Sequence, residues 1–168
     1  MTDTDAAVNA VEPTAERPGF PPGYSAMSTL PWSWAEKRLI EAMVYWFASS
    51  TDSKRPYVRP LWGAWHDNAL WFRTGSRLAR YFAARPEVTI HADGADDVVI
   101  VDGAVSGPWP TPPPVVAMLT TKYANHPDVD PAYVFRPTQA YGWSCDNTGE
   151  DGGIALWTTA TRWRFPAA

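Results

Sequence analysis

Residues 72–86 read FRTGSRLARYFAARP and join a predicted strand to a predicted helix. Gly75 allows a turn, and Ser76 is a good helix N-cap. Free N–H groups at a helix N-terminus, together with the helix dipole, favour a bound anion. The stretch also carries four arginines: Arg73, Arg77, Arg80 and Arg85. A bound phosphate would explain positive charge in the first helical turn, but a solvated basic face paired with surface acids fits the same pattern.

Short strands separated by turn signals surround this stretch. The predicted strands are 44–50, 55–65, 69–74, 87–92, 98–107, 133–144 and 153–165, and further helices are predicted at 33–42 and 115–123. Pro60 cannot donate to a strand ladder and indicates an edge or a bulge, and Gly103 indicates a bulge. We therefore expect a mainly β protein with short helices, in which antiparallel strands close into a small barrel without exposed edges.

The composition favours one folded domain. The chain has 168 residues, 45% of them hydrophobic and 19% charged, with a net charge of −4. Residues 1–24 are acidic and then proline-rich, which predicts a flexible tail before a domain at 25–168. The acidic balance argues against nucleic acid as a partner. With no apolar run long enough for a signal peptide or a membrane span, we expect a cytoplasmic protein without membrane contact.

The remaining composition bears on ligands. Ten tryptophans either fill the core with large rings or line a ligand site or a subunit contact. The histidines His66, His91 and His126 match no metal-binding spacing, so we expect no metal site. Cys145 is the only cysteine, and no His–Asp pattern accompanies it. This argues against nucleophilic catalysis, and we nominate no catalytic side chain.

Four segments taken in order resemble a known family: PYVRPLWGAW (56–65), LWFRTGSRLARYFAARPEVTIH (70–91), VVIVDGAVSG (98–107) and ATRWRF (160–165). Their order and spacing resemble the pyridoxamine 5′-phosphate oxidase-like superfamily, the FMN-binding split barrels. The pattern is most similar to an actinobacterial-type branch whose members bind FMN or the deazaflavin coenzyme F420. The resemblance runs from about Pro31 to Phe165. It implies a split β-barrel that forms a homodimer, with a cofactor at each of two sites between the subunits.

The resemblance also implies a set of cofactor-binding residues. They are Arg59, Ser76 and Arg77 at the phosphate, Pro60, Leu61 and Trp62 along the isoalloxazine ring, Trp71 and Phe72 at the end of the next strand, and Arg162 from the partner subunit. The family has a lysine where this chain has Leu78. Arg80 is the nearest replacement for that charge, although its side chain leaves the helix about 200° round from position 78.

The function implied is an oxidoreductase that transfers a hydride between FMN or coenzyme F420 and a small organic substrate. The cofactor supplies the chemistry, and the protein supplies position and charge. The long polyglutamate tail of F420 would favour an open basic groove, which Arg73, Arg80 and Arg85 could line. Two alternatives stay open: a split barrel that only carries a cofactor, and one that binds an apolar ligand in a Trp-rich cavity. The short C-terminus argues against pyridoxal phosphate synthesis.

Overall fold

A computed structural model describes residues 11–19, 28–51, 55–94, 97–124, 130–144 and 158–166. The strands are β1 (Thr14–Glu16), β2 (Tyr45–Ser50), β3 (Pro56–Leu61), β4 (Gly63–His66), β5 (Ala69–Phe72), β6 (Glu87–Ala92), β7 (Asp97–Trp109), β8 (Ala132–Ser144) and β9 (Thr161–Arg164). The helices with described bounds are α1 (Trp32–Glu41), α2 (Leu78–Ala84) and α3 (Pro113–Lys122). Cys145, His126 and the first part of the strand predicted at 153–165 lie outside the described residues.

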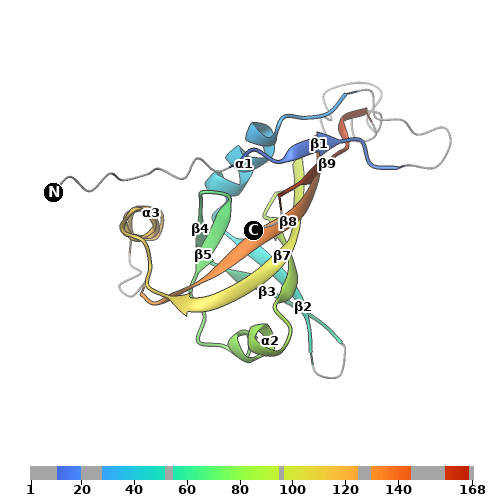
Figure 1. Cartoon of the computed structure of the whole chain (residues 1–168). Coiled ribbons are helices and arrows are strands. Elements are labelled where there is room, and N and C mark those ends of the chain that lie inside the picture. Colours follow the sequence, from blue (N-terminus) through green and yellow to red (C-terminus); the bar gives the residue numbers. More distant parts are fainter. Residues whose placement is uncertain are drawn as a thin grey trace.

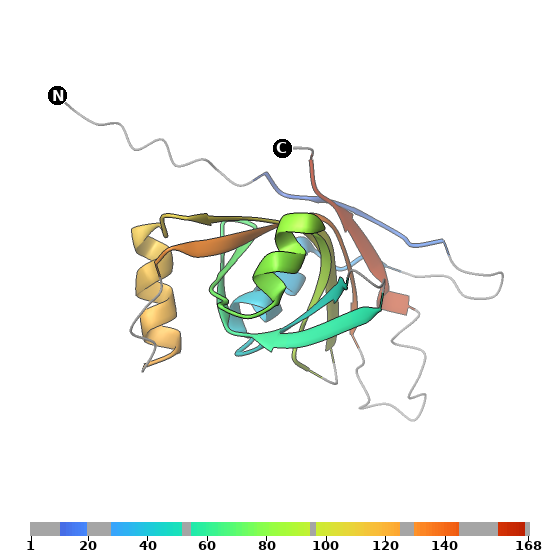
Figure 2. The same cartoon turned by 90° about the horizontal axis from the view of Figure 1, so that it is seen from below.

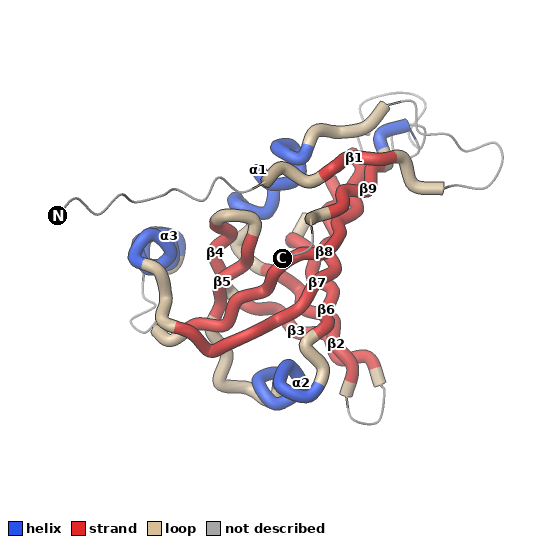
Figure 3. The backbone as a smooth tube through the Cα atoms, in the orientation of Figure 1, coloured by secondary structure: helices blue, strands red, loops and turns tan. Residues whose placement is uncertain are grey.

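The strands form one antiparallel sheet that curls on itself (Figure 3). Their order is β1-β9-β8-β7-β6-β2-β3, with β4 paired to β5 and β5 paired to β8. One edge of the long strand β8 therefore pairs with both β5 and β9, and its other edge pairs with β7. This arrangement confirms the expected mainly β, antiparallel architecture.

The bulge predicted at Gly103 is present. The register between β7 and β8 shifts between Asp102 and Gly103. A Cβ atom at Gly103 would lie 2.1 Å from the carbonyl oxygen of Arg136 and 2.8 Å from the ring of Phe135. Only glycine allows β8 to approach this closely, and the bend helps the long strand pair to curl.

The helices take up different places around the strands. Figures 1 and 2 show α1 and α2 at opposite ends of the barrel, whereas α3 stands at its side against β4. Three tryptophans fill the core near α1: Trp32, Trp65 and Trp163 are each at most 4% exposed. Burying such large rings contributes much of the apolar area that stabilises a small domain. Within the described residues, no helix has the length and apolar character needed to cross a membrane.

The structure differs from the predicted strands and tail at three places. Among the described residues, the strand predicted at 153–165 begins only at Thr161, because residues 158–159 are helical. The strand predicted at 55–65 is broken at Trp62 into β3 and β4, and β3, with Pro60, ends the path of paired strands as an edge. Within the predicted tail, Thr14–Glu16 forms β1 and pairs with β9. Glu16 stabilises this pairing because its carboxylate accepts hydrogen bonds from Arg162 and Arg164.

Candidate functional site

Aromatic contacts bring arginines of β3 and α2 to one side of the barrel. The guanidinium carbon of Arg59 lies 4.0 Å above the centre of the Tyr57 ring. Tyr57 in turn packs edge-on against Tyr81 of α2, with ring centres 5.3 Å apart. The backbone N–H of Tyr81 bonds the carbonyl oxygen of Arg77 one turn earlier. These contacts pack the strand that carries Arg59 against α2, whose first turn follows Arg77.

Ser76 organises the start of α2. Its hydroxyl oxygen accepts the backbone N–H of Leu78 at 3.2 Å and lies 2.8 Å from the hydroxyl oxygen of Thr74. The regular helix begins at Leu78, later than the predicted cap position implies, yet the Ser76 hydroxyl still satisfies a free helical N–H.

The basic side chains around α2 have different surroundings. Arg77 and Arg80 are exposed, and in the described part of the chain their guanidinium groups make no hydrogen bond or ion pair. Arg85 is held, because it donates a 2.6 Å hydrogen bond to the carbonyl oxygen of Thr51. We call Arg59, Ser76, Arg77 and Arg80 the arginine surface. Among the described residues, the guanidinium groups of Arg77 and Arg80 are unpaired and can bind an anion, whereas Arg59 donates a 2.7 Å hydrogen bond to the carbonyl oxygen of Val58.

Leu78, where the family has a lysine, is an anchor of the core. Its side chain is 0% exposed and belongs to the same apolar cluster as Phe47 and Phe82. The leucine therefore fixes α2 against the barrel and puts no group on the surface. Any cation that replaces the family's lysine has to come from another position, and Arg80 is exposed on the same helix.

The residues predicted to lie along a cofactor ring divide into exposed and buried groups. Trp62 is 53% exposed and Pro60 is exposed, while Leu61 is half-buried. Trp71 is half-buried and packs against the small apolar cluster that α3 forms with β4. The Phe72 ring lies inside the core at 1% exposure. A ligand on this side would therefore meet Trp62 and Pro60, but not the Phe72 ring.

Arg162 stands apart from the arginine surface within one chain. It lies on β9, which β8, β7, β6 and β2 separate from β3 in sheet order. Its Nε donates a 2.5 Å hydrogen bond to Glu16, which also accepts one from Arg164 at 2.6 Å. The hydrogen bond from Arg164, with a further one from Arg162, holds the pKa of the Glu16 carboxyl below its usual value. The role of Arg162 in a partner's site stays a prediction.

A second polar group lies where α1, β2, β4 and α3 meet, and sequence reasoning missed it. Lys122 donates hydrogen bonds to the carbonyl oxygens of Ile40 and Gly63, both at 3.2 Å, and to the hydroxyl of Tyr45 at 3.1 Å. Burial lowers the pKa of Lys122 to about 8. We call Ile40, Tyr45, Gly63, Lys122 and Tyr123 the lysine corner.

Tyr123 completes the lysine corner. Its hydroxyl donates to the carbonyl oxygens of Met43 (2.8 Å) and Gly63 (3.0 Å), between which its one proton is shared, and it accepts the Gly63 N–H at 3.1 Å. Burial raises the pKa of Tyr123. The Trp62 ring stacks on the Tyr123 ring, with centres 5.0 Å apart and an angle of 5° between the planes. The lysine corner thus orients Trp62.

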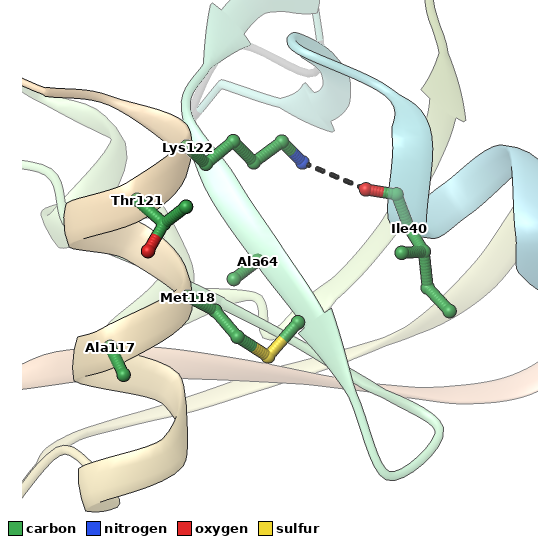
Figure 4. Close-up of a pocket in the computed structure, with 6 residues that line it drawn as sticks. All are labelled: Ile40, Ala64, Ala117, Met118, Thr121 and Lys122. Atoms are coloured by element: carbon green, nitrogen blue, oxygen red, sulfur yellow. Dashed lines mark hydrogen bonds between the residues drawn. The ribbon is translucent and has the colours of Figure 1, made fainter.

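A hollow of about 370 Å³ opens beside the lysine corner (Figure 4). Its lining consists of Ile40, Ala64, Ala117, Met118, Thr121 and Lys122. Figure 4 shows the Met118 side chain reaching across the hollow below Lys122, the charged residue of the lining. This volume lies within the range of small-molecule sites, and an apolar wall with few polar groups is typical of them.

The sequence carried only a weak signal for the lysine corner. Lys122 is the one charged residue in the helical segment PPVVAMLTTK, but its partners come from residues 40, 45 and 63. Two of those partners are backbone carbonyl oxygens, which no residue type reveals. The hydroxyl of Tyr45 is the third, and it donates its own proton to the carbonyl oxygen of Leu39.

Comparison with known proteins adds evidence on the fold. No family model and no curated protein matches the sequence. Among solved structures, a FAD-binding protein of Mesorhizobium loti has a TM-score of 0.54 at 17% identity, covering 82% of this chain and 96% of its own. An F420 reductase has a TM-score of 0.50 at 24% identity, covering 72% of this chain and 98% of its own. A candidate pyridoxamine 5′-phosphate oxidase of Listeria innocua has a TM-score of 0.50 at 13% identity, covering 64% of this chain and 94% of its own.

These similarities show the fold. The chain has the split β-barrel of the pyridoxamine 5′-phosphate oxidase-like proteins, as the sequence resemblance predicted. With identities between 13% and 24%, they do not assign a cofactor or a reaction.

Proposed function

We propose that this protein is an oxidoreductase that uses FMN or coenzyme F420 to transfer a hydride to or from a small organic substrate. The observation that carries the proposal is the arginine surface. Arg77 and Arg80 are exposed without ion partners in the described chain, next to the Ser76 hydroxyl. A fold shared with a FAD-binding protein and an F420 reductase supports the same conclusion.

The donor groups of the arginine surface suit a phosphate. Guanidinium groups bind phosphate oxygens through charge-assisted hydrogen bonds, and a serine hydroxyl adds a short neutral one. We assign Arg59, Ser76 and Arg77 to the phosphate, with Arg80 as a further cation. Pro60, Leu61 and Trp62 would border the ring, because the exposed Trp62 offers an aromatic surface. When bound, such a cofactor supplies the hydride chemistry.

The hollow beside the lysine corner is our proposed place for the substrate. Met118 and Ile40 supply apolar walls, which favour an organic molecule and exclude water. Lys122 bounds one end of the hollow, although its donors are used on acceptors of its own chain. Trp62, in the segment that we assign to the cofactor ring, stacks on Tyr123, the residue that follows Lys122 of the lining.

We further propose that the protein is a homodimer. One face of the sheet carries Trp46, stacked on His91 with ring centres 6.3 Å apart, and the 42% exposed Val58 of the edge strand β3. Large rings and exposed aliphatic groups on a sheet face are typical of subunit interfaces. Light scattering after gel filtration should give twice the chain mass, and Val58→Glu should shift the protein towards the single-chain mass. A wild-type protein that elutes with the mass of one chain would contradict the dimer.

A cofactor titration tests the proposed function. Purified protein is titrated with FMN and separately with coenzyme F420, and fluorescence reports binding. We expect micromolar or tighter binding of one of the two. Arg77→Ala should weaken it by about 1.5–3 kcal/mol, roughly 10- to 150-fold, the effect of one charge-assisted hydrogen bond. The control Lys37→Ala removes the same charge from the exposed surface of α1 and should leave the affinity unchanged.

Two results would redirect the proposal. Equal affinity in Arg77→Ala and wild-type protein would remove the phosphate site from the arginine surface. Binding of neither cofactor would favour the alternative of a non-catalytic barrel that takes an apolar ligand. The apolar hollow of α3 is the observation that supports this alternative, whereas Trp32, Trp65 and Trp163 are buried in the core.

A further inference from the structure

The Lys122 amine meets three acceptors in three separate segments of the chain. Ile40 lies in the last turn of α1, Tyr45 begins β2 and Gly63 begins β4. The Tyr45 hydroxyl donates its proton to Leu39, so towards Lys122 it can only accept. An ammonium group has three donors and no acceptor, and the three partners use all of them. A neutral amine has two donors, so one partner loses its hydrogen bond when the proton leaves.

Gly63 connects the loss of a Lys122 hydrogen bond to the position of Trp62, its neighbour in the chain. A Cβ atom at position 63 would lie 2.9 Å from the carbonyl oxygen of Trp71, so β4 packs tightly here and the Gly63 backbone is buried. The Gly63 carbonyl oxygen takes hydrogen bonds from Lys122 and from Tyr123. Trp62, the residue before it, stacks on the Tyr123 ring. The position of the Trp62 ring therefore depends on the same contacts that hold Gly63.

No carboxylate faces Lys122 among the described contacts. The titratable groups that face it are the hydroxyls of Tyr45 on β2 and Tyr123 after α3, and burial raises the pKa of both. Of the charged groups elsewhere on the packed elements, Lys37 pairs with Glu41, Arg38 pairs with Asp97 and His66 lies beside Asp67. Glu36 is the remaining acid of α1, and none of the described contacts joins it to Lys122. Without a counter-charge, burial lowers the pKa of Lys122 to about 8, within reach of ordinary buffers.

We propose that Lys122 is a positioning residue whose ammonium group holds the Trp62–Gly63 corner, and that loss of its proton releases the Trp62 ring. The inference rests on the proposed function in one respect: Trp62 would border the cofactor ring, so its release would weaken cofactor binding as the pH rises. The movement of Trp62 itself requires no cofactor. It can be measured on the protein alone.

The first test uses protein labelled with 5-fluorotryptophan, with the Trp62 resonance assigned by its absence in Trp62→Phe. We expect the ¹⁹F shift of Trp62 to titrate with a midpoint near the Lys122 pKa of about 8. In Lys122→Arg, which stays charged throughout, the resonance should not titrate in this range. Lys37→Arg, an exposed control on α1, should titrate like the wild type. A Trp62 shift that is constant in wild-type protein, or that titrates equally in Lys122→Arg, would overturn the proposal.

The second test asks whether the charge of Lys122 affects cofactor binding. The dissociation constant of FMN or coenzyme F420, whichever binds, is measured at pH 6.5 and at pH 9.5. We expect it to rise roughly 2- to 10-fold in wild-type protein, the effect of one hydrogen bond, and to rise less in Lys122→Arg. An equal rise in both proteins would contradict a role of Lys122 in cofactor binding. If neither cofactor binds at either pH, the proposed function fails, and the fluorine titration still decides the role of Lys122.

Discussion

The arginine surface and the lysine corner use positive charge in opposite ways. Arg77 and Arg80 extend from α2 into solvent with donors to spare. Lys122 has turned inward and uses every donor on three acceptors of its own chain. The first arrangement costs little folding free energy and leaves capacity for a ligand. The second orders three segments but carries the cost of taking a charge partly out of water.

The difference separates binding from positioning. A cation whose donors are unused in the folded chain can recognise an anion with little rearrangement. A cation whose donors are all used can act on a ligand only through the groups that it holds. Trp62 is where the two regions meet, because it is the last residue of the predicted ring-binding segment and stacks on Tyr123 of the lysine corner. Variants in each region should therefore affect different quantities.

The largest effect is expected at the anchor beneath the arginine surface. Leu78→Ala should lower the free energy of unfolding by about 2–5 kcal/mol, because the side chain is fully buried and its removal leaves a cavity. Arg80→Ala, on the exposed side of the same helix, should change it by no more than about 0.5 kcal/mol. Chemical denaturation followed by circular dichroism measures both. Equal stability of the two variants would mean that α2 is not anchored through Leu78.

This contrast also shows why the sequence predicts one region better than the other. Apart from Arg59 on β3, the arginine surface lies in a continuous stretch where strand, glycine, capping serine and helix follow in order, and this helix forms as predicted. Gly103 was predictable for the same reason, because a glycine within a β-branched run indicates a local bulge. These features depend on residues close together in the chain.

The features that sequence reasoning missed depend on distant segments. The burial of Leu78 follows from packing with Phe47, and the hydrogen bonds of Lys122 follow from the way α3 meets α1 and β4. The pairing of β1 with β9 rests on Glu16 reaching arginines almost at the other end of the chain. A spacing rule cannot reveal a backbone carbonyl oxygen as a partner. Such contacts between distant segments can be identified only from the folded structure.

The smaller expected effect lies in the lysine corner. Tyr123→Phe keeps the ring on which Trp62 stacks but removes the hydroxyl that accepts the buried Gly63 N–H. We expect the free energy of unfolding to fall by about 1–3 kcal/mol, the cost of an unsatisfied buried donor. Tyr133→Phe is the matched control, because no hydrogen bond of the Tyr133 hydroxyl occurs among the described residues. Its stability should stay within about 0.5 kcal/mol of wild type.

The outcome of this pair bears on cofactor binding as well as on stability. If Tyr123→Phe is destabilised while its affinity for FMN or F420 stays unchanged, the lysine corner serves the fold, and the stacked ring alone suffices to place Trp62. If affinity falls together with stability, the hydrogen bonds to Gly63 set the position of Trp62, because the ring that it stacks on is intact. A Tyr123→Phe protein as stable as Tyr133→Phe would show that solvent replaces the lost partner of Gly63.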